Sequence, residues 1–272
     1  MKFVTYNIHF GVGRDENANL DRIAEAIDGA DVIALQEVER FWPRSGMIDQ
    51  PLALGKRLPD YWWVYGPNID LHSSETFPGE AAGKRRQFGN MILAKRPILA
   101  SENLPLPRLP GEPRSMRRGA LEAIVGTPTG GLRIVSTHLC YLSAPTRVAQ
   151  AEHLFARHAE VGTHGGAWDG EHPADPSWYL GDEPTMPPRA IIMGDLNFDP
   201  SDPEYAATIG RADVAFADAW PLMRSDRGAT KDGQRIDHAW LTKDLGATLR
   251  WAWVDDSADG SDHQPVWFDL DI

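Results

Sequence analysis

Short runs in which hydrophobic and polar residues alternate occur along the whole chain. Residues 2–8 repeat with a period of two, which is typical of a β-strand whose two faces meet different surroundings. Apolar runs of strand length follow at intervals almost to the last residue. We predict further strands in the ranges 31–36, 91–94, 121–125, 132–139, 190–193, 236–241, 249–254 and 265–270.

Two segments are predicted to be helices, and the first of them shows the helical period. Before Gly29, hydrophobic residues recur at i, i+3, i+4 and i+7, and the glycine follows as a stop signal, so this segment is predicted to be an amphipathic helix. The residues on its apolar face are Leu20, Ile23, Ala24 and Ile27. A second helix is predicted to run to about residue 160, with Ser143 as its N-cap and Pro145 in its first turn.

The predicted strands outnumber the helices and are spread from end to end. This arrangement predicts a layered α/β (α+β) fold with two β-sheets, rather than one purely parallel, doubly wound sheet. Two stretches, 67–87 and 164–189, lack periodicity and are predicted to be long loops. Neither is a domain linker, because motifs needed for one site lie on both sides of each. We therefore expect one domain over residues 1–272.

The composition is that of an ordinary water-soluble globular protein, with 42% hydrophobic and 24% charged residues. No apolar run approaches the roughly 20 residues of a membrane helix, and the first ten residues lack the pattern of a signal peptide. The single cysteine, Cys140, excludes an internal disulfide. The cytoplasm is the expected location, and no protein partner is predicted.

The net charge of −12 argues against a protein that grips long nucleic acids, because such proteins offer a basic face to the phosphates. Basic residues gather only at 84–86 and between 108 and 118. We favour solvated loop charges for these clusters. The alternative is a small rim that steers phosphate toward an acidic metal site.

Polar residues stand at the ends of several predicted strands, where a side chain can leave the core while its backbone stays fixed. The segments are Thr5-Tyr6-Asn7, Leu35-Gln36-Glu37, Ser136-Thr137-His138, Gly194-Asp195-Leu196-Asn197, Arg235-Ile236-Asp237-His238 and Ser261-Asp262-His263. By itself, an acidic residue after a strand is usually just the first solvated position of a loop. The number, order and kind of these segments together indicate an active site.

In this order the segments resemble the signature of the endonuclease/exonuclease/phosphatase superfamily. That superfamily includes pancreatic-type deoxyribonucleases, apurinic endonucleases, neutral sphingomyelinases and inositol-polyphosphate phosphatases. The resemblance runs from Asn7 to His263, and Gly-Asp-Leu-Asn and the final Ser-Asp-His-Gln-Pro-Val are its most specific parts. It implies a four-layer sandwich, in which two packed mixed β-sheets are flanked by helices and the site lies at one rim.

The resemblance also implies metal and substrate ligands. Glu37 resembles the principal metal-binding carboxylate, a hard oxygen ligand that suits Mg²⁺ or Mn²⁺. Asp262 would be a further acidic contact, direct or through water. Asn7 would lie beside the metal and hold the phosphate or the attacking water. Asn90 and Arg118 resemble recurring family positions and are expected to bind the substrate.

The remaining motif residues resemble the groups that carry out the reaction. Asp195 resembles the carboxylate that orients or deprotonates the attacking water, and Asn197 would hold the phosphate or that water. His263 would contact a phosphate oxygen, while Asp237 would fix its tautomer and raise its pKa. His138 would be a second imidazole on the phosphate. Such groups, aimed at developing negative charge, are what in-line phosphoryl displacement needs.

Some positions allow a structural interpretation. Asn7 could bond a neighbouring loop, although Asn is depleted in strands. A histidine like His138 on an apolar strand is usually a core residue when it stands alone. His238 follows Asp237 and points to the opposite face of its strand, so we interpret it as structural. His9 stands where some family members carry an acidic residue that supports the metal, which leaves a second metal position in doubt.

The superfamily includes several kinds of hydrolase, so the resemblance does not identify the substrate. Our first choice is a phosphodiesterase or phosphatase acting on a small or lipid-derived phosphoester. The enzymatic alternative is a nuclease acting on short or damaged nucleic acid, and an alternative of another class is a catalytically inactive binding module. Trp168, Trp178 and Tyr179 could cap a small or lipid-like substrate, or pack on a neighbouring subunit or on their own domain.

Overall fold

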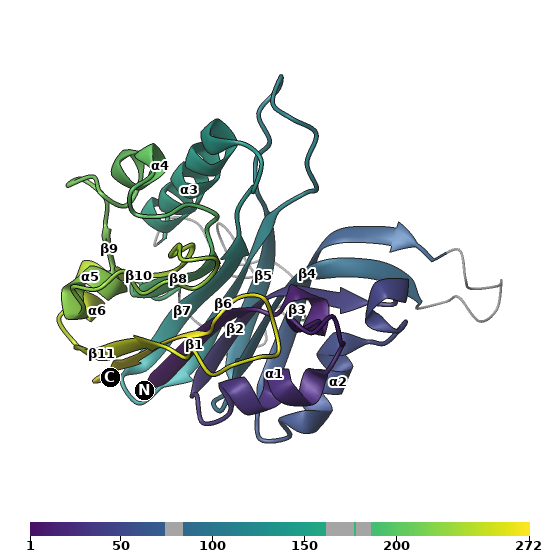
Figure 1. Cartoon of the computed structure of the whole chain (residues 1–272). Helices are drawn as coiled ribbons and strands as arrows, with labels where there is room; N and C mark the ends of the chain where they lie inside the picture. Colours follow the sequence, from purple (N-terminus) through teal and green to yellow (C-terminus); the bar gives the residue numbers. More distant parts are fainter. Residues whose placement is uncertain (74–83, 162–176, 178–185) are drawn as a thin grey trace.

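A computed structural model describes residues 1–73, 84–161, 177 and 186–272 (Figure 1). Within these residues the chain forms strands, α-helices and two short 3₁₀ helices. In chain order they are β1 (Lys2–Asn7), η1 (His9–Gly11), α1 (Leu20–Ile27), β2 (Val32–Arg40), η2 (Pro43–Ser45), α2 (Gln50–Arg57), β3 (Trp62–His72), β4 (Arg85–Ala94), β5 (Ile98–Pro105), β6 (Gly119–Thr127), β7 (Gly130–His138), α3 (Ala144–Ala159), β8 (Ala190–Asp195), α4 (Pro203–Ala207), β9 (Phe216–Asp218), α5 (Ala219–Met223), β10 (Asp237–Thr242), α6 (Lys243–Gly246), β11 (Leu249–Val254) and β12 (Val266–Leu270).

The strands form two six-stranded sheets. The first sheet has the order β11-β12-β1-β2-β4-β3 and the second has the order β5-β6-β7-β8-β10-β9. Both sheets are mixed, because β1 runs parallel to β2 and β7 runs parallel to β8, whereas the other neighbours are antiparallel. Two mixed sheets are what the strand-rich pattern of the sequence predicts.

The inner faces of the two sheets pack together and form the main core. Phe3, Ala34 and Ile92 of the first sheet belong to the same buried cluster as Ile134 and Met193 of the second. Phe3 also stacks on Phe268, with ring centroids 5.1 Å apart. Because side chains alternate between the faces of a strand, the outer faces are apolar as well and need a cover of their own.

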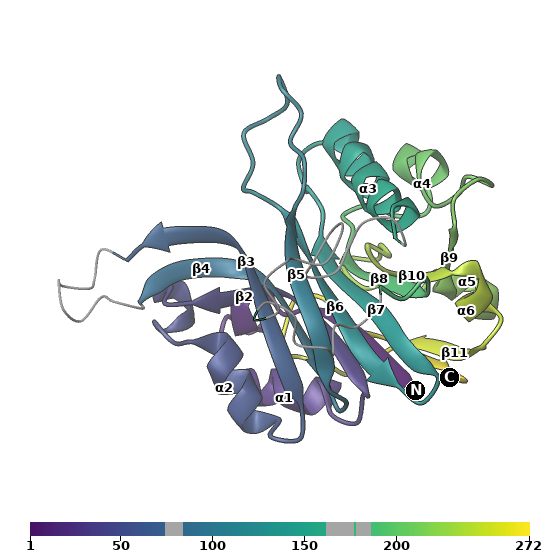
Figure 2. The same ribbon diagram turned by 180° about the vertical axis from the view of Figure 1, so that it is seen from behind.

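Helices cover both outer faces. Ile23 and Ile27 of α1 pack with Leu54 of α2 and with Ile33 of the first sheet. On the far side, α3 packs on the second sheet, and the two faces are seen together in Figures 1 and 2. The resulting order of layers is helix, sheet, sheet, helix, which confirms the predicted four-layer sandwich. No helix in the described ranges combines the length and apolar character needed to cross a membrane.

Both predicted helices form, and each has a side-chain N-cap. The Asn19 side chain accepts a hydrogen bond from the backbone N–H of Asp21 at the start of α1. The Ser143 hydroxyl accepts one from the N–H of Thr146, so it caps α3 as predicted. Such caps satisfy amide groups that the first helical turn leaves without an intrahelical partner.

The stretch 67–87 is not one loop, and the prediction is wrong at both of its ends. β3 continues to His72 and β4 starts at Arg85, with Asp70 opposite Gln87 in the pairing. This part of the hairpin is exposed and polar, so it lacks the apolar alternation that identifies a half-buried strand. The loop predicted at 164–189 lies almost wholly outside the described residues.

Because β12 near the C-terminus pairs with β1 at the N-terminus, the two ends of the chain lie side by side (Figure 1). The N-terminal amino group of Met1 also contacts Asp269 at 3.2 Å. Strands from both ends of the sequence thus share one sheet. We infer from this closure that residues 1–272 form a single domain.

A buried ion pair fastens the loop before β10 to the end of β9. Arg235 donates to both carboxylate oxygens of Asp218, at 3.2 and 2.7 Å, and Tyr205 donates to the same carboxylate at 3.0 Å. Burial alone would raise the pKa of Asp218, but His238 and Arg235 lower it well below its usual range. The pair therefore stabilises the fold above pH of about 4, the usual pKa of an aspartate.

Replacing Asp218 with Ala is expected to lower the free energy of unfolding at pH 7 by about 3–5 kcal/mol, because it leaves the buried Arg235 charge unpaired. Since the pKa of Asp218 is depressed in the folded state, the difference from the wild type should shrink as the pH falls below about 4. Urea unfolding at both pH values measures this. Asp213→Ala, on an exposed carboxylate, is the control. A loss at pH 7 no larger than that of the control would contradict the assignment.

Candidate active site

Strand register brings most of the predicted site residues to one rim of the sandwich. Asp195 ends β8 directly opposite His138 at the end of β7 and opposite Asp237 at the start of β10. Asn7 ends β1 in the first sheet beside Gln36 of β2. Because parallel strands end at the same edge, the polar groups that follow each apolar run converge there.

Asp195 lies at the centre of this group and is 2% exposed. Its Oδ2 atom accepts a hydrogen bond from Asn7 Nδ2 at 2.9 Å and lies 3.3 Å from His138 Nε2 and 3.7 Å from His263 Nε2. Burial, together with the nearby Asp237 carboxylate, raises the pKa of Asp195 to about 6. A carboxylate with such a pKa is a better proton acceptor near neutral pH than an exposed aspartate.

The structure pairs His263 with Asp237. Nδ1 of the imidazole lies 2.8 Å from Oδ2 of Asp237, and both side chains are buried. A carboxylate only accepts hydrogen bonds, so Nδ1 carries the hydrogen and Nε2 is the atom that faces Asp195. Burial opposes the charged imidazole, yet the contact with Asp237 raises the pKa of His263 to about 9.

The pKa of His138 is shifted in the opposite direction to that of His263. Burial, and then the positive charge of Arg118, lower the pKa of His138 well below its usual value. Its Nδ1 atom has no hydrogen-bond partner in the described part of the chain and lies 3.8 Å from Glu37 Oε1. The two histidines of the site are therefore not equivalent: one is a neutral imidazole, and the other is held as a cation.

Glu37 reaches the site because β2 bulges at this residue. The pairing of β2 with β4 shifts register between Leu35 and Val38, and Glu37 has a positive φ of 60°. Such bulges re-aim one side chain, and a strained backbone outside glycine is a feature of functional sites. The Glu37 side chain is 17% exposed, and its Oε1 atom accepts from Asn7 Nδ2 at 3.2 Å.

The backbone explains why a glycine precedes Asp195. Gly194 has φ of 151°, and a Cβ atom there would lie 1.8 Å from the Thr137 carbonyl oxygen of β7. Only glycine allows the two strands to approach this closely beside the site. Two residues further on, Asn197 has φ of 57° and donates from Nδ2 to the carbonyl of Leu139 at 3.1 Å.

The two expected substrate ligands outside the motifs are both buried. Asn90 donates its amide hydrogens to the carbonyls of Gly119 and Ser136, at 2.9 and 3.1 Å, and so ties β4 to the second sheet. Only its carbonyl oxygen is left for a substrate. Arg118 is 4% exposed, and its Nε atom has no partner among the described residues. Its guanidinium carbon lies 5.7 Å from the centre of the Tyr141 ring.

Asp262 forms an ion pair with a lysine that the sequence analysis did not name. Lys231, which belongs to none of the motifs, donates to Asp262 Oδ2 at 2.6 Å and lies 3.2 Å from His263 Nε2. Sequence reasoning missed this lysine because a lone basic residue in a loop has no periodic signal. The Asp-Gly pair after it, a turn signal, was the available pointer to its fixed position.

Two further histidines considered in the sequence analysis, His238 and His9, lie beside the central group. His238 lies on β10 opposite Gly194, is 1% exposed, and contacts Arg235 and the carbonyl of Phe198, in line with the structural interpretation. His9 contacts the carbonyl of Val12 at 3.1 Å and lies 3.8 Å from Asp262 Oδ1.

The charges at the rim fit a divalent cation. Four carboxylates gather there, those of Glu37, Asp195, Asp237 and Asp262, against the cationic groups of His263, Lys231 and Arg118. Oδ1 of Asp262 and Oδ1 of Asp237 are buried without a partner among the described residues. Asp195, Asp237 and His263 have ligand atoms within 4.8 Å of one another. Hard oxygen donors of this kind suit Mg²⁺ or Mn²⁺.

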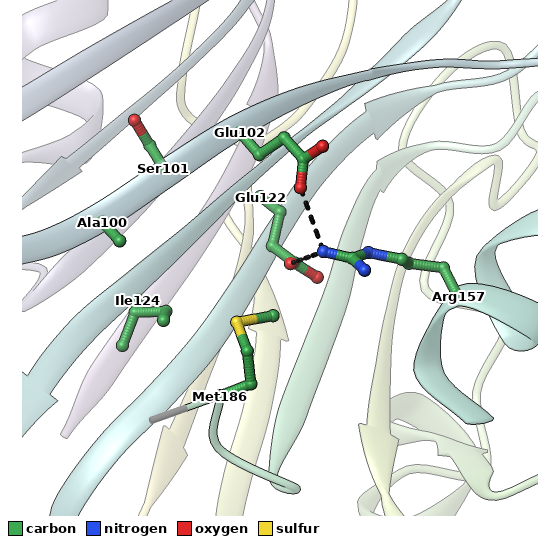
Figure 3. A pocket seen from close by; sticks show the side chains of 7 residues that line it. All are labelled: Ala100, Ser101, Glu102, Glu122, Ile124, Arg157 and Met186. Carbon is green, nitrogen blue, oxygen red and sulfur yellow. Dashed lines mark hydrogen bonds and ion pairs between the residues drawn. The ribbon is translucent and has the colours of Figure 1, made fainter. Parts of the chain in front are cut away.

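Another cavity, of about 250 Å³, lies on the outer face of the second sheet beside α3 (Figure 3). Arg157 spans it and contacts Glu102 at 3.0 Å and Glu122 at 3.4 Å. The rest of its described lining is mostly apolar, and none of the motif residues reaches it. Its described lining includes an ion-paired arginine but no imidazole or free acid, so the rim remains the candidate active site.

The chain is similar to known proteins in two comparisons, one with family models and one with solved structures. The model of the endonuclease/exonuclease/phosphatase family matches residues 4–263. A family member of known structure from Beutenbergia cavernae is 21% identical, with a TM-score of 0.72 over 99% of this chain and 71% of its own. A mannosyl-6-phosphatase from Bacteroides thetaiotaomicron is 15% identical, with a TM-score of 0.70 over the whole of both chains. TDP2 from Caenorhabditis elegans is 18% identical, with a TM-score of 0.62 over 98% and 96%.

At these identities the similarity of the solved structures extends to the fold alone. No curated protein matches the sequence at a significant level. The match to the family model, in contrast, spans nearly the whole chain and includes every motif that forms the rim.

Proposed function

The chain belongs to the endonuclease/exonuclease/phosphatase family, and from that premise we propose that it hydrolyses small or lipid-derived phosphoesters with the help of a divalent metal ion. The proposal rests on the groups that surround the Asp195 carboxylate. A buried carboxylate with a raised pKa faces two imidazoles and one amide, and one imidazole is fixed by a second carboxylate. This set can activate water and bind a phosphate.

In this proposal Asp195 takes the proton of the attacking water, while Asn7 orients the carboxylate through its hydrogen bond. His263, held by Asp237, points Nε2 toward the same place and donates a hydrogen bond to a phosphate oxygen. His138 is kept neutral by burial and contacts the phosphate without adding charge. A bound divalent cation would polarise the phosphoryl group and stabilise the negative charge that develops on it.

We propose Glu37 as the principal metal ligand, with Mg²⁺ or Mn²⁺ as the ion. Its side chain is the most accessible of the carboxylates that contact Asn7, and the bulge in β2 aims it at the rim. Asn7 lies between Glu37 and Asp195 and would hold the metal-bound phosphate in place. Asn197 and Arg118 are proposed to complete the phosphate contacts, and Asn90 to contribute through its carbonyl oxygen.

The charge of the protein supports a small or lipid-derived substrate, because the net charge of −12 opposes the long basic track that duplex binding needs. A nuclease acting on short or damaged nucleic acid is the second candidate. It is favoured by the exposed Arg108, Arg114 and Arg117 on the loop that leads to Arg118. This loop projects beyond the sheets between β5 and β6 (Figure 1).

An inactive binding module is disfavoured, because the residues expected to carry the chemistry are present and close together. Trp168, Trp178 and Tyr179 lie outside the described residues, so a capping role for them stays a prediction. We also propose the cytoplasm as the location, which is supported by the buried and unpaired Cys140.

The proposal is tested with bis(p-nitrophenyl) phosphate and p-nitrophenyl phosphate, each with Mg²⁺, Mn²⁺ or EDTA. Cleavage of the diester alone, abolished by EDTA, indicates a phosphodiesterase, and cleavage of the monoester indicates a phosphatase. Because small reporters lack remote binding groups, a lipid phosphoester and a short oligonucleotide are assayed beside them. Absence of metal-dependent cleavage of all four substrates would contradict the proposed function.

Replacing Glu37 with Ala is expected to weaken Mn²⁺ binding by at least about tenfold, since even the loss of a group that only orients a metal ligand costs this much. Mn²⁺ titration followed by electron paramagnetic resonance measures the affinity without any substrate. Glu25→Ala, on the exposed face of α1, is the matched control and should bind Mn²⁺ like the wild type. Equal Mn²⁺ affinity of Glu37→Ala and the control would remove Glu37 from the metal site.

A further inference from the structure

The side chain of Lys231 faces the active site although no motif includes it. Its Nζ atom donates to Asp262 Oδ2 at 2.6 Å and lies 3.2 Å from His263 Nε2. These are its only side-chain partners in the part of the chain that the structure describes. An ammonium group has three hydrogens, and the charged imidazole of His263 accepts none of them, so two hydrogens are left for other acceptors. The side chain is 30% exposed, and such an acceptor can therefore come from solvent.

The backbone of Lys231 is fixed by a tight turn. Lys231 and Gln234 exchange two backbone hydrogen bonds, of 3.1 and 2.8 Å, across Asp232 and Gly233. Both turn residues have positive φ, 47° and 79°, as a type I′ turn requires. The rigid turn therefore fixes the backbone from which the lysine side chain extends. A group that is positioned before the reaction can stabilise a transition state without a cost of reorganisation.

The same turn is joined to the two elements that carry the Asp237–His263 pair. The carbonyl of Thr230 accepts from the N–H of Gln264 at 2.8 Å, next to His263. The hydroxyl of Thr230 accepts from the N–H of Asp237 at 3.2 Å. Lys231 and His263 therefore keep their relative position, and their nitrogen atoms converge on one point in front of Asp195.

Resting on the proposed function, we propose that Lys231 is a phosphate-binding residue, and that one of its free hydrogens bonds to the phosphate oxygen that His263 Nε2 also faces. Two nitrogen atoms 3.2 Å apart can share one oxygen acceptor, and charge-assisted bonds of this kind are among the strongest available to a protein. Asp262 then holds the ammonium group in place instead of binding the metal ion directly. Lys231 supplies a fixed positive charge where the phosphoryl group develops negative charge.

A simpler role for Lys231 would be to neutralise Asp262 without touching the substrate. The two roles differ in what happens when both charges are removed. If Lys231 only neutralises Asp262, then Asp262→Asn restores phosphate binding in a Lys231→Met protein. If Lys231 contacts the phosphate, the double variant binds phosphate as weakly as Lys231→Met alone.

The experiment measures binding of inorganic phosphate by calorimetry in the presence of Mg²⁺, for the wild type, Lys231→Met, Lys231→Arg and the double variant. Lys56→Met, an exposed lysine of α2, is the control for loss of a positive charge. Lys231→Met is expected to weaken phosphate binding by about 10- to 100-fold, the usual worth of a hydrogen bond to a charged group. Lys231→Arg should recover part of this loss, and thermal unfolding confirms that each variant is folded.

The outcomes separate the two proposals. Phosphate binding by Lys231→Met equal to that of Lys56→Met overturns the role of Lys231 and leaves the proposed function standing. Restoration of binding by Asp262→Asn in the Lys231→Met protein overturns it as well. A wild-type protein that binds no phosphate with any divalent metal contradicts the phosphoester function itself. In a Mn²⁺ titration, Asp262→Asn should keep its affinity within a few-fold, and a loss as large as that of Glu37→Ala would make Asp262 a direct ligand.

Discussion

Replacing Asp195 with Asn is expected to reduce turnover by about 10²-fold or more while leaving the fold intact, since loss of a positioned general base costs about this much. The amide is nearly the same size as the carboxylate and can still accept the hydrogen bond from Asn7, so packing at the rim is retained. It cannot accept a proton from water. Steady-state rates on the best reporter, with thermal unfolding as the test of folding, measure the effect.

The control for this variant is Asp213→Asn, which removes one negative charge from an exposed side chain far from any motif. It should turn over at the wild-type rate. If Asp195→Asn also retained a near-wild-type rate with saturating metal, Asp195 would have no part in activating the water. Another group at the rim would then have to be the base.

Removing His263 and removing Asp237 are expected to have effects that are far from additive. The single variants His263→Ala and Asp237→Ala should each lose roughly 10²- to 10³-fold in turnover, the usual cost of losing one stabilising donor. The double variant should lose little more than the worse single variant, because the two side chains form one unit through the 2.8 Å contact. A double-mutant cycle on turnover gives the coupling directly.

The matched control cycle combines His263→Ala with Asp213→Asn, a carboxylate that makes no contact with the imidazole. That cycle should be additive. Additive losses for the Asp237 cycle as well would mean that Asp237 neither fixes nor charges His263 during the reaction. The pairing seen in the structure would then serve stability alone.

The elements that could be predicted are those that bury apolar side chains, on one face for the helices and on both faces for the strands. Both predicted helices have one apolar face and a polar N-cap, and the predicted strands have buried residues on both faces. β5 was missed because it is an edge strand and most of its side chains are exposed, so no apolar alternation identifies it. β3 was missed for a related reason, since its outer half is polar.

The candidate site could be predicted from sequence because strand register, which the pattern of apolar residues largely sets, determines where most of its residues lie. Residues that follow an apolar run end up at a strand end, and the structure brings Asp195, His138 and Asp237 together in this way. The sequence could not reveal contacts made across the two sheets or from loops. Lys231 is the clearest example, because its partner Asp262 is 31 residues away and only the fold brings the two together.

The hydrogen bond between Asn7 and Asp195 joins the first sheet to the second, and the hydroxyl of Ser261, in the connection between β11 and β12, holds Asn7 through a bond to its carbonyl at 2.7 Å. The proposed active site therefore links the two sheets of the sandwich. Any fluctuation that separates the sheets at this rim would move the proposed catalytic groups apart. We therefore expect heat inactivation to be cooperative. Activity would be lost in one transition, when the two sheets separate, and not in a gradual decline caused by local unfolding of a surface loop.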